Sequence, residues 1–394
     1  MNKIKVVLPF MTTMNFHKNY EGGDKYIYYF SKELAKQGID VTIVTTQLEN
    51  REIKEKFENG VRYVFLPPRV IGKRLFKLNS PYRLLFSYNL KKYLEKTDFD
   101  ILHSFGPLAY FYLHKSRKKR KPVISQPWGF APFYLPESLS QKGIKKVFLK
   151  YFIQHPWLYC SKKADLIAIE GDFELPLIRD LGLDKNKTFS LPIGIDLEVT
   201  KKFKKNYRDI RKKFNFSKKD LVLLAVNQVS PDKGVDLLIN SFALLKKKIK
   251  HSKLIVVGSG SLEGMMQNLI KKHKLENDVV HLKGIPEKEL YDCYFSSDIF
   301  VCAQTQQNVS VSVQEAMACG LPIVSFDQVV LVKNDKNGIA VKNKNSDGLK
   351  EGILKIYRGD MRKLGAGSLD LIKNYTWETI AKTAITKYKE LLKQ

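Results

Sequence analysis

Residues 221–245 read LVLLAVNQVSPDKGVDLLINSFALL, which is a short apolar run, a polar turn and a second apolar stretch with helical spacing. The first run predicts a buried strand, and the apolar positions after Gly234 predict a helix that packs on it. Lys233 and Gly234 then fall in the loop at the carboxyl end of the strand. Open α/β sheets bind ligands at that edge, so the Lys233 ammonium can meet a phosphate at the cleft between domains.

The same alternation of short apolar runs and helical patterns extends in both directions along the chain. The predicted strands are KIKVVLPF, VTIVTT, VRYVFLP, DILHSF, PVIS, ADLIAIE and TFSLPIG in the first half, and LVLLAV, KLIVVG, VVHLKG, DIFVCA and PIVSF in the second. A helix over 25–37 separates the first two. Such βαβ alternation predicts an α/β protein with two doubly wound domains, 1–195 and 196–375, joined near Pro192 and Gly194.

Length and cysteine content agree with two intracellular domains. The 394 residues exceed what one hydrophobic core usually fills, and a hydrophobic fraction of 44% is ample for two cores. The four cysteines lie far apart, with no CxxC pair: Cys160, Cys293, Cys302 and Cys319. We therefore expect free thiols in a reducing compartment, with neither disulfides nor a structural metal.

The formal net charge of +28 is the strongest global signal. Nucleic acid, an anionic membrane face and phosphorylated substrates are all attracted by such a charge. The alternative is that lysine simply serves as the common surface residue. The apolar run in MNKIKVVLPF is too short for a signal peptide, and no stretch of about 18 apolar residues occurs. We expect an intracellular protein that does not span a bilayer.

Glycine-containing turns follow several other predicted strands and supply candidate contacts to a nucleotide. They contain Gly22, Gly23, Gly258, Gly260, Gly284, Ile285 and Pro286. Paired glycines at a helix start let the backbone approach a phosphate and add exposed N–H groups, while the turn at 284–286 suits a flat base. Each is also compatible with an ordinary tight turn. Their joint placement at strand ends favours a nucleotide site.

These motifs together resemble a known family, the retaining nucleotide-sugar glycosyltransferases of family 4. The resemblance spans nearly the whole chain and rests on EGG, ADLIAIE, LPIGID, SPDKG, VVGSGSLE, QEAMACGLPIV, NGIAV and YTWETIAKTAITKYKELL. It implies the GT-B architecture of two Rossmann-like domains. The acceptor would bind residues 1–195, the nucleotide sugar would bind residues 196–375, and a C-terminal helix, 376–394, would return to the first domain.

The resemblance also implies roles for individual residues. Gly22 and Gly23 match glycines that face the donor diphosphate, and Lys233 matches the lysine of the diphosphate clamp. Glu315 matches the second glutamate of the E-x7-E motif, which accepts hydrogen bonds from the ribose hydroxyls. A carboxylate suits a diol, and we expect it in the first turn of a helix, whose N-terminus keeps it ionised. The alternative is that Glu315 only caps its helix.

Several positions depart from the family pattern. Gln228 replaces the usual clamp arginine, Gln307 replaces the first glutamate of E-x7-E, and only His103 remains of a histidine pair whose second position is Phe105. Polar groups of suitable size remain, which favours a modified site over a degenerate homologue that no longer transfers sugar. The implied donor-binding residues are Gly22, Gly23, Gln228, Lys233, Gly258, Gly260, Gly284, Ile285, Asn308, Val309, Ser310 and Glu315, and the implied catalytic residues are Lys233, Gln307 and His103.

The resemblance implies a mechanism without a metal or other cofactor. The leaving diphosphate itself takes the proton of the acceptor, so charge neutralisation by Lys233 and the backbone at Gly22 and Gly23 is the main catalytic task. His103 is a candidate acceptor-side hydrogen-bonding group, and a buried histidine with satisfied partners is the alternative. The expected partners are a nucleotide sugar and a saccharide or lipid-linked acceptor.

Two lysine-rich stretches of the first half suggest a membrane surface. Aromatic and aliphatic residues alternate with lysine in residues 71–96 and from Lys142 to Lys163, as in helices that lie in a membrane interface. The alternative is amphipathic packing with a solvated basic face. The membrane interpretation predicts a peripheral protein at the inner face, with a lipid-linked acceptor. A nucleic-acid-binding module would explain the charge but not the sugar-nucleotide motifs.

Overall fold

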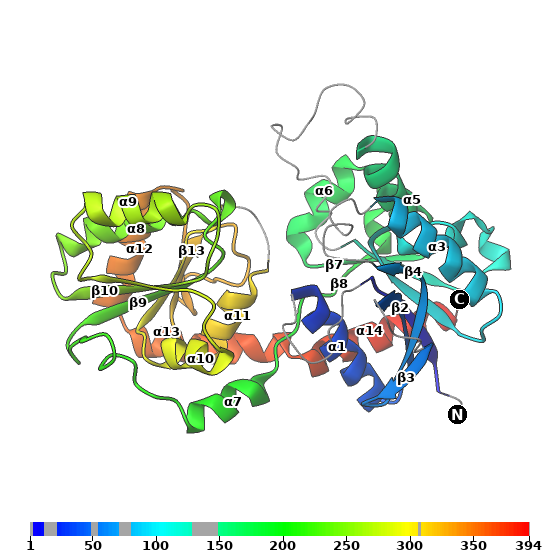
Figure 1. Ribbon diagram of the computed structural model, residues 1–394, viewed down its shortest axis with the longest axis horizontal. Helices are drawn as coiled ribbons and strands as arrows, with labels where there is room; N and C mark the ends of the chain where they lie inside the picture. Colours follow the sequence, from blue (N-terminus) through cyan, green and yellow to red (C-terminus); the bar gives the residue numbers. More distant parts are fainter. Residues whose placement is uncertain are drawn as a thin grey trace. The chain divides into compact units, whose positions relative to one another are not determined.

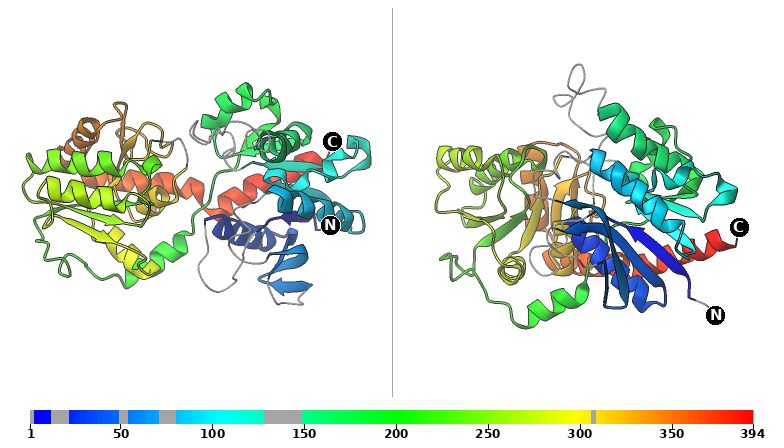
Figure 2. Two further views of the ribbon diagram at one scale, coloured as in Figure 1. Left: turned by 45° about the horizontal axis from the view of Figure 1, so that its top comes forward. Right: turned by 45° about the vertical axis from the view of Figure 1, so that its right-hand side comes forward.

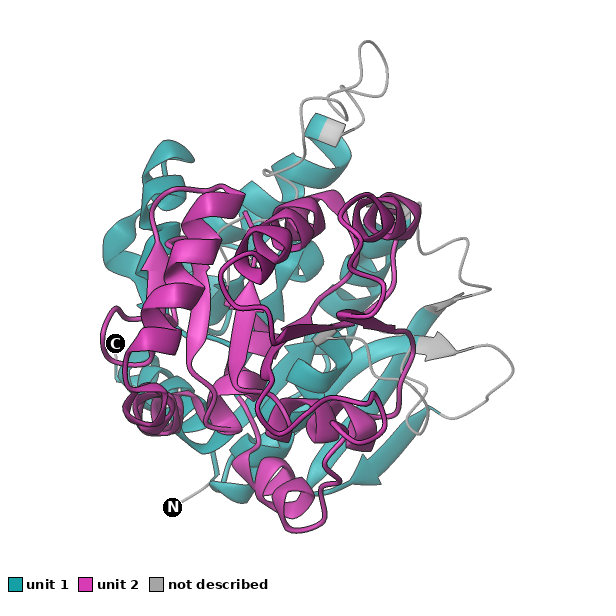
Figure 3. Cartoon of the chain, turned by 90° about the vertical axis from the view of Figure 1, so that its left-hand side faces the viewer, with its two compact units in different colours: residues 1–194, 377–394 teal, residues 195–376 magenta. Residues whose placement is uncertain are grey.

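The computed structural model describes residues 3–11, 22–48, 54–70, 80–127, 149–305 and 309–393 (Figure 1). The chain divides into two compact units, which Figure 3 distinguishes by colour. Unit 1 comprises Met1–Gly194 and Trp377–Gln394, and unit 2 comprises Ile195–Thr376. Each unit is an α/β fold of its own.

Unit 1 contains an eight-stranded sheet in the order β3-β4-β2-β1-β5-β6-β7-β8. All neighbouring strands are parallel except β3 and β4. The strands are β1 (Lys5–Pro9), β2 (Asp40–Leu48), β3 (Glu55–Glu58), β4 (Val61–Val70), β5 (Ile101–Phe105), β6 (Val123–Gln126), β7 (Leu166–Ile169) and β8 (Thr188–Ser190).

Helical segments cover both faces of this sheet. The α-helices are α1 (Gly22–Lys36), α3 (Ser80–Leu94), α5 (His155–Lys163), α6 (Leu175–Asp180) and α14 (Trp377–Leu392), and η6 (Leu149–Gln154) is a π-helix before α5. Short 3₁₀ turns are η1 (Gly106–Ala109), η2 (Tyr112–His114), η3 (Arg117–Lys119), η7 (Asp172–Glu174) and η8 (Lys185–Lys187). Successive β1 side chains alternate between two cores. Val6 and Leu8 pack with α1 and α14, and Val7 packs with α3 and α5.

The last helix, α14, belongs to unit 1 although it follows unit 2 in the sequence. It packs beside α1, and the Trp377 and Tyr26 rings meet edge to face with centroids 5.2 Å apart. A Cβ at Gly194 would lie 2.5 Å from Cδ2 of Trp377, so only glycine fits there. The chain leaves unit 1 after Gly194 and returns to it at Trp377, so this contact joins the two ends of the break in unit 1.

Unit 2 contains a six-stranded, wholly parallel sheet in the order β11-β10-β9-β12-β13-β14. The strands are β9 (Leu221–Val226), β10 (Ser252–Val257), β11 (Val279–Leu282), β12 (Ile299–Cys302), β13 (Ile323–Phe326) and β14 (Gly338–Val341). The first three strands are added outward on one side, and the chain then returns to place β12 beside β9. The switch point of this doubly wound sheet therefore lies between β9 and β12.

Helices cover both faces of the unit 2 sheet (Figures 1 and 2). They are α7 (Leu197–Lys205), α8 (Val235–Lys246), α9 (Glu263–Lys272), α10 (Glu287–Phe295), α11 (Val311–Ala318), α12 (Ser346–Arg358) and α13 (Met361–Ile372), with 3₁₀ turns η9 (Pro231–Lys233) and η10 (Lys373–Tyr375). α8, α9 and α12 share one large core with the sheet. α11 packs against α13 on the other face.

The observed elements confirm the α/β prediction with two parallel-dominated sheets. Each predicted strand is present, and the helix predicted over 25–37 is α1, which begins three residues earlier. Two short edge strands, β3 and β14, were not predicted. Within the described residues, no helix is long and apolar enough to cross a membrane.

Candidate active site

The carboxyl edge of the unit 2 sheet brings Lys233 and Gln304 together. Lys233 follows β9 and Gln304 follows β12, the two strands that flank the switch point. The Lys233 ammonium donates to Gln304 Oε1 at 3.1 Å, and the Thr305 amide donates to the Asp232 carbonyl at 3.2 Å. Both loops are thereby linked where open α/β sheets bind their ligands.

The Lys233 ammonium is partly buried and has two protein partners. Its side chain is 19% exposed, and Nζ lies 3.1 Å from the Asp232 carboxylate. Asp232 also accepts a hydrogen bond from the Ser230 hydroxyl at 2.6 Å. Partial burial raises the pKa of Asp232, but the hydrogen bonds from Ser230 and Lys233 outweigh it, and the net pKa is lowered. The site therefore holds a positioned cation beside an ionised carboxylate.

Glycine is required at two places of this edge by the backbone alone. Gly234 has φ +62°, and a Cβ there would lie 2.2 Å from the Ala303 carbonyl oxygen. Gly258 has φ +140°, and a Cβ would lie 1.9 Å from the Asn227 carbonyl oxygen. These glycines let neighbouring loops pack closely, whether or not a phosphate binds there.

The other predicted residues of the unit 2 loops lie along the same edge. The Val229 amide donates to the Ser259 carbonyl at 3.0 Å, which joins the loop of Gln228 to that of Gly258 and Gly260. The Gln228 side chain is exposed. Gly284 and Ile285 follow β11, the outermost strand on that side of the sheet.

Glu315 lies in α11, but in its second turn rather than its first. It is the fifth residue of Val311–Ala318, and the first turn carries no acidic residue. The prediction that Glu315 lies in the first turn, at the helix N-terminus, is therefore wrong, and so is the alternative that it caps the helix. The helix begins at Val311, four residues before Glu315. Instead, the buried Tyr294 hydroxyl donates to Glu315 Oε2 at 2.8 Å.

The segment before α11 is described only in part. Gln307 and Asn308 lie outside the described residues. Val309 and Ser310 are buried, and Ser310 precedes the first residue of the helix without capping it through its side chain. Its hydroxyl lies 3.0 Å from that of Ser312.

In unit 1, Gly22 and Gly23 are the first two residues of α1. This helix follows β1, so its N-terminus lies at the carboxyl edge of the unit 1 sheet. Its leading N–H groups have no carbonyl partner within the helix and carry its positive dipole end. Asp24, which is buried, is the acidic residue of the first turn.

His103 lies within β5 and is fully buried, with both ring nitrogens bonded to other side chains. Nδ1 is 2.8 Å from the Tyr388 hydroxyl, and Nε2 is 3.0 Å from Gln126 Oε1. Gln126 Nε2 in turn donates to the Tyr26 hydroxyl at 2.9 Å. Burial lowers the pKa of His103 to about 3, although the Gln126 contact raises it. The ring is therefore neutral, and it ties α14 and α1 to the sheet rather than lying at the edge.

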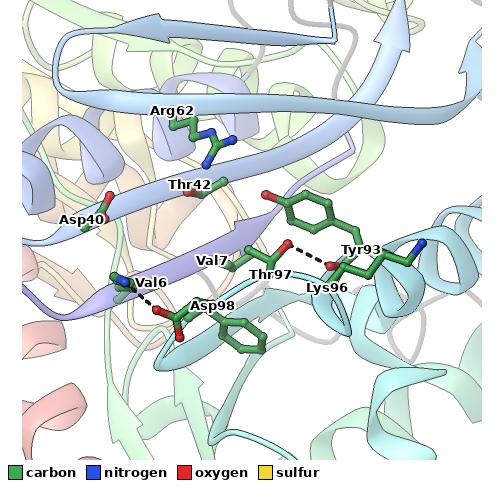
Figure 4. Close-up of a pocket in the computed structure, with 11 residues that line it drawn as sticks. Val6, Val7, Asp40, Thr42, Arg62, Tyr93, Lys96, Thr97 and Asp98 are labelled. Atoms are coloured by element: carbon green, nitrogen blue, oxygen red, sulfur yellow. Dashed lines mark hydrogen bonds and ion pairs between the residues drawn. The ribbon is translucent and has the colours of Figure 1, made fainter.

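A separate polar pocket of about 400 Å³ lies at the amino edge of the unit 1 sheet (Figure 4). It is lined by Lys5, Val6, Val7, Asp40, Thr42, Arg62, Tyr93, Lys96, Thr97, Asp98 and Phe99. Lys5 pairs with Asp98 at 2.6 Å, and Arg62 pairs with Glu55 at 2.8 Å. Lys5 and Arg62 are thus paired with carboxylates, and Asp40 adds a further acidic group, which makes the pocket a poor place for a diphosphate.

The described residues contain no group of three or more His, Cys, Asp and Glu side chains that could hold a metal ion. The side chains that sequence reasoning missed are Asp232, Gln304 and Tyr294 in unit 2, and Gln126 and Tyr388 in unit 1. Each contacts a predicted site residue, and most come from a different element. Only Asp232, which adjoins Lys233, could have been inferred from its place in the sequence.

The chain matches two family models and a set of known glycosyltransferases. Residues 20–199 match Glycosyltransferase Family 4, and residues 206–366 match Glycosyl transferases group 1. Alpha-monoglucosyldiacylglycerol synthase of Acholeplasma laidlawii is 25% identical over 86% of this chain and 87% of its own length. Mannosylfructose-phosphate synthase of Agrobacterium fabrum is 24% identical over 76% and 69%.

Solved structures share the fold over almost the whole chain. Sucrose-phosphate synthase from Thermosynechococcus elongatus superimposes with a TM-score of 0.75 at 18% identity, covering 99% of both chains. HepE from Anabaena, in complex with UDP, gives 0.70 at 14% identity, covering 98% of this chain and all of the other. The solved structures show the GT-B architecture, and the two family matches, which together span most of the chain, show that the chain is an enzyme of glycosyltransferase family 4.

Proposed function

We propose that this glycosyltransferase moves a hexose-type sugar from a nucleoside diphosphate to an acceptor with retention of anomeric configuration, and that Lys233 stabilises the leaving diphosphate. The observation that carries the proposal is the place of the Lys233 ammonium, beside the switch point of the unit 2 sheet. It is held by the neutral oxygen of Gln304 and by Asp232. A positioned cation needs no rearrangement to meet charge that develops on a phosphate oxygen.

The proposed chemical step involves one bond broken and one bond formed at the anomeric carbon of the sugar. The bond from this carbon to the diphosphate oxygen breaks, and an acceptor hydroxyl oxygen bonds to the same face of the sugar. The acceptor proton passes to the departing diphosphate. Lys233 balances the negative charge of that diphosphate.

Glu315 is proposed to bind the ribose of the donor. Its carboxylate is half-buried in α11, and one of its oxygens already accepts the Tyr294 hydroxyl. A carboxylate has four lone-pair positions, so two ribose hydroxyls can be accepted as well. The uncharged amides of Gln228 and Gln307 are proposed to bond the donor where the family has an arginine and a glutamate.

No metal ion takes part in the proposed reaction, because Lys233 and backbone amides supply the positive charge. Transfer should therefore continue when a chelator such as EDTA is present. Loss of transfer with EDTA, and its recovery with added magnesium or manganese, would contradict this part of the proposal.

The identity of the donor is tested by calorimetric titration with a panel of sugar nucleotides. Structural neighbours were solved with UDP, with UDP-glucose and with ADP, so uridine and adenosine diphosphate sugars are the first to compare. The proposal predicts that at least one sugar nucleotide binds and is turned over to a glycosylated acceptor. Binding without hydrolysis or transfer to any acceptor would instead favour a degenerate homologue.

We further propose that unit 1 binds an anionic membrane surface and that the acceptor is lipid-linked. The segments α3, η6 and α5 pack beside one another, and their 15, 6 and 9 residues include no Asp or Glu. The chain has 40 acidic residues, yet none lies in these three segments, so the charged side chains of the segments are all basic. Residues 142–148 of the predicted lysine-rich stretch lie outside the described residues.

Exposed apolar side chains lie among these positive charges. Tyr88 is 42% exposed and Tyr151 57%, and each has a lysine ammonium near its ring, Lys92 at 4.5 Å and Lys150 at 5.7 Å from the centroid. Leu85 and Phe152 on the same two segments are also exposed. Rings that enter the acyl boundary beside lysines at the headgroups are typical of a helix that lies on a membrane.

Co-sedimentation with vesicles that contain phosphatidylglycerol tests the membrane proposal. Binding should be clear at low salt and weaken as salt rises, because charge attraction is screened within about 10 Å at 0.1 M salt. Replacing Tyr88 and Phe152 by serine should weaken binding. The matched control is Phe57→Ser, since Phe57 is 73% exposed but lies on β3 between Glu55 and Glu58. Equal binding by all variants, or no binding by the folded parent, would refute the proposal.

A further inference from the structure

Tyr294 is a buried tyrosine whose hydroxyl contacts a proposed ligand-binding carboxylate. It lies in α10, is fully buried, and donates to Glu315 Oε2 at 2.8 Å across 21 residues of sequence. The same hydroxyl is 3.3 Å from the Ser312 carbonyl oxygen. Of these two contacts of the hydroxyl, the one to the Glu315 side chain is the shorter.

The tyrosine is held rigidly by its surroundings. Its ring stacks on Phe300 of β12, with centroids 6.0 Å apart and an angle of 30° between the planes. Burial raises the pKa of Tyr294 well above its ordinary value, and the nearby Glu315 charge raises it further. The hydroxyl therefore stays protonated and remains a hydrogen-bond donor at every physiological pH.

Glu315 lies in the second turn of α11, and the Tyr294 hydroxyl reaches its carboxylate from another helix, α10. A charge-assisted hydrogen bond from a rigid donor fixes the rotation of the carboxylate about its last bond. That rotation decides where the remaining lone pairs of Glu315 point. Precise binding of two vicinal hydroxyls requires those lone pairs to be placed in advance.

We propose that Tyr294 is a positioning residue for ribose recognition, which orients the Glu315 carboxylate toward the 2′- and 3′-hydroxyls of the donor nucleotide. This inference rests on the proposed function of Glu315 and deepens it. It assigns to the site a selectivity for ribonucleotides over nucleotides that lack the ribose hydroxyls. Tyr294 itself touches no ligand.

The test measures ribose discrimination rather than affinity alone. UDP and ADP are each compared by calorimetry with their 2′,3′-dideoxy forms, for the parent and for Tyr294→Phe. The expected result is that Tyr294→Phe weakens binding of the ribonucleotide by about three- to tenfold and leaves the dideoxynucleotide unchanged. A purely structural role of Tyr294 would weaken both ligands equally and would overturn the proposal.

Two further variants separate the inference from the function on which it rests. Tyr357→Phe is the control for removal of a tyrosine hydroxyl elsewhere in unit 2, because this residue lies in α12 and its hydroxyl is 3.4 Å from His251; discrimination should be unchanged. Glu315→Gln should lose most of the discrimination. If Glu315→Gln keeps it, both the proposed role of Glu315 and the inference fail. If Glu315→Gln loses it while Tyr294→Phe keeps it, only the inference fails.

A folding defect can be recognised independently. Thermal melting of Tyr294→Phe shows whether the buried core tolerates the loss of the hydroxyl. Should this variant not fold, Tyr294→Met places a flexible apolar side chain there, which can adapt to the cavity and also lacks the donor. The same loss of ribose discrimination is expected, and equal weakening of both ligand forms again overturns the proposal.

Discussion

Glu174 is a buried carboxyl group whose ionisation opposes folding. It is 1% exposed in η7 and accepts the Glu170 amide at 2.6 Å through Oε2, and no group of the described residues bonds to its Oε1. Burial raises the pKa of Glu174 to about 7, although the amide contact lowers it. The folded state thus holds a proton that the unfolded state releases near its ordinary pKa of 4.5.

The first prediction concerns the pH dependence of stability. Because the pKa of Glu174 is raised in the folded state, the stability that this group contributes is fully present below pH 4.5. It is lost as the pH rises toward 7. Glu174→Gln should remove this loss, which is at most about 3 kcal/mol. Urea unfolding of parent and variant at about pH 5 and about pH 8 measures it. An identical change with pH in both proteins would contradict the assignment.

The second prediction concerns the two glutamines of the donor site. The resemblance to the family implies that Gln228 and Gln307 replace a cation and an anion, so the proposed donor site would keep its charge balance. Gln307→Glu alone should not raise transfer, because its charge repels the diphosphate while one clamp cation is absent. Adding Gln228→Arg should recover part of the lost transfer. Initial rates of the parent, the two single variants and the double variant give the coupling energy between the two positions. A strong gain in transfer rate from Gln307→Glu alone would indicate that the parent is a disabled homologue. Additive effects of the two changes would show that the two positions are not coupled.

At the scale of elements, α14 is fixed to unit 1 by a buried hydrogen bond as well as by apolar packing. The Tyr388 hydroxyl lies 2.8 Å from His103 Nδ1, across 285 residues of sequence. Both groups are fully buried, so neither can exchange this contact for one with water. The bond therefore joins the end of the chain to the central part of the first sheet.

The third prediction is that Tyr388→Phe destabilises unit 1. Removal of the hydroxyl leaves a buried ring nitrogen of His103 without its partner, which costs about 1–3 kcal/mol. Urea unfolding followed by circular dichroism measures the change in free energy. Tyr357→Phe is the control, since its hydroxyl lies 3.4 Å from His251 in an exposed contact of unit 2. Equal losses of unfolding free energy in the two variants would contradict a stabilising role of the buried hydrogen bond.

The elements also show what sequence patterns can and cannot predict. The buried parallel strands were predictable because their apolar runs have no polar face. The edge strand β3 has the sequence EKFE and exposes alternate residues, so it carries no such signal. The second-turn position of Glu315 was missed because the serine and valine residues before it suit a strand as well as a helix.

At the scale of the whole molecule, the residues of the glycine-containing loops could be predicted from the sequence. The side chains that contact them from distant parts of the chain could not. Lys233 and Gly234 lie in a local strand–turn–helix pattern that the sequence displays directly. Gln304 and Tyr294 reach their partners across 71 and 21 residues, and no periodicity encodes such contacts. The sequence therefore predicted that Lys233 lies in the loop after β9, but not the groups that contact its ammonium.

The central claim is that Lys233 binds the donor diphosphate, and calorimetry tests it most directly. Lys253→Ala is the control, because Lys253 is equally buried and also pairs with an aspartate, at the amino end of β10. Lys233→Ala should weaken binding of a nucleoside diphosphate by at least about tenfold, leave binding of the bare nucleoside unchanged, and exceed any effect of the control. Unchanged affinity of Lys233→Ala for every nucleotide that binds the parent would contradict the account.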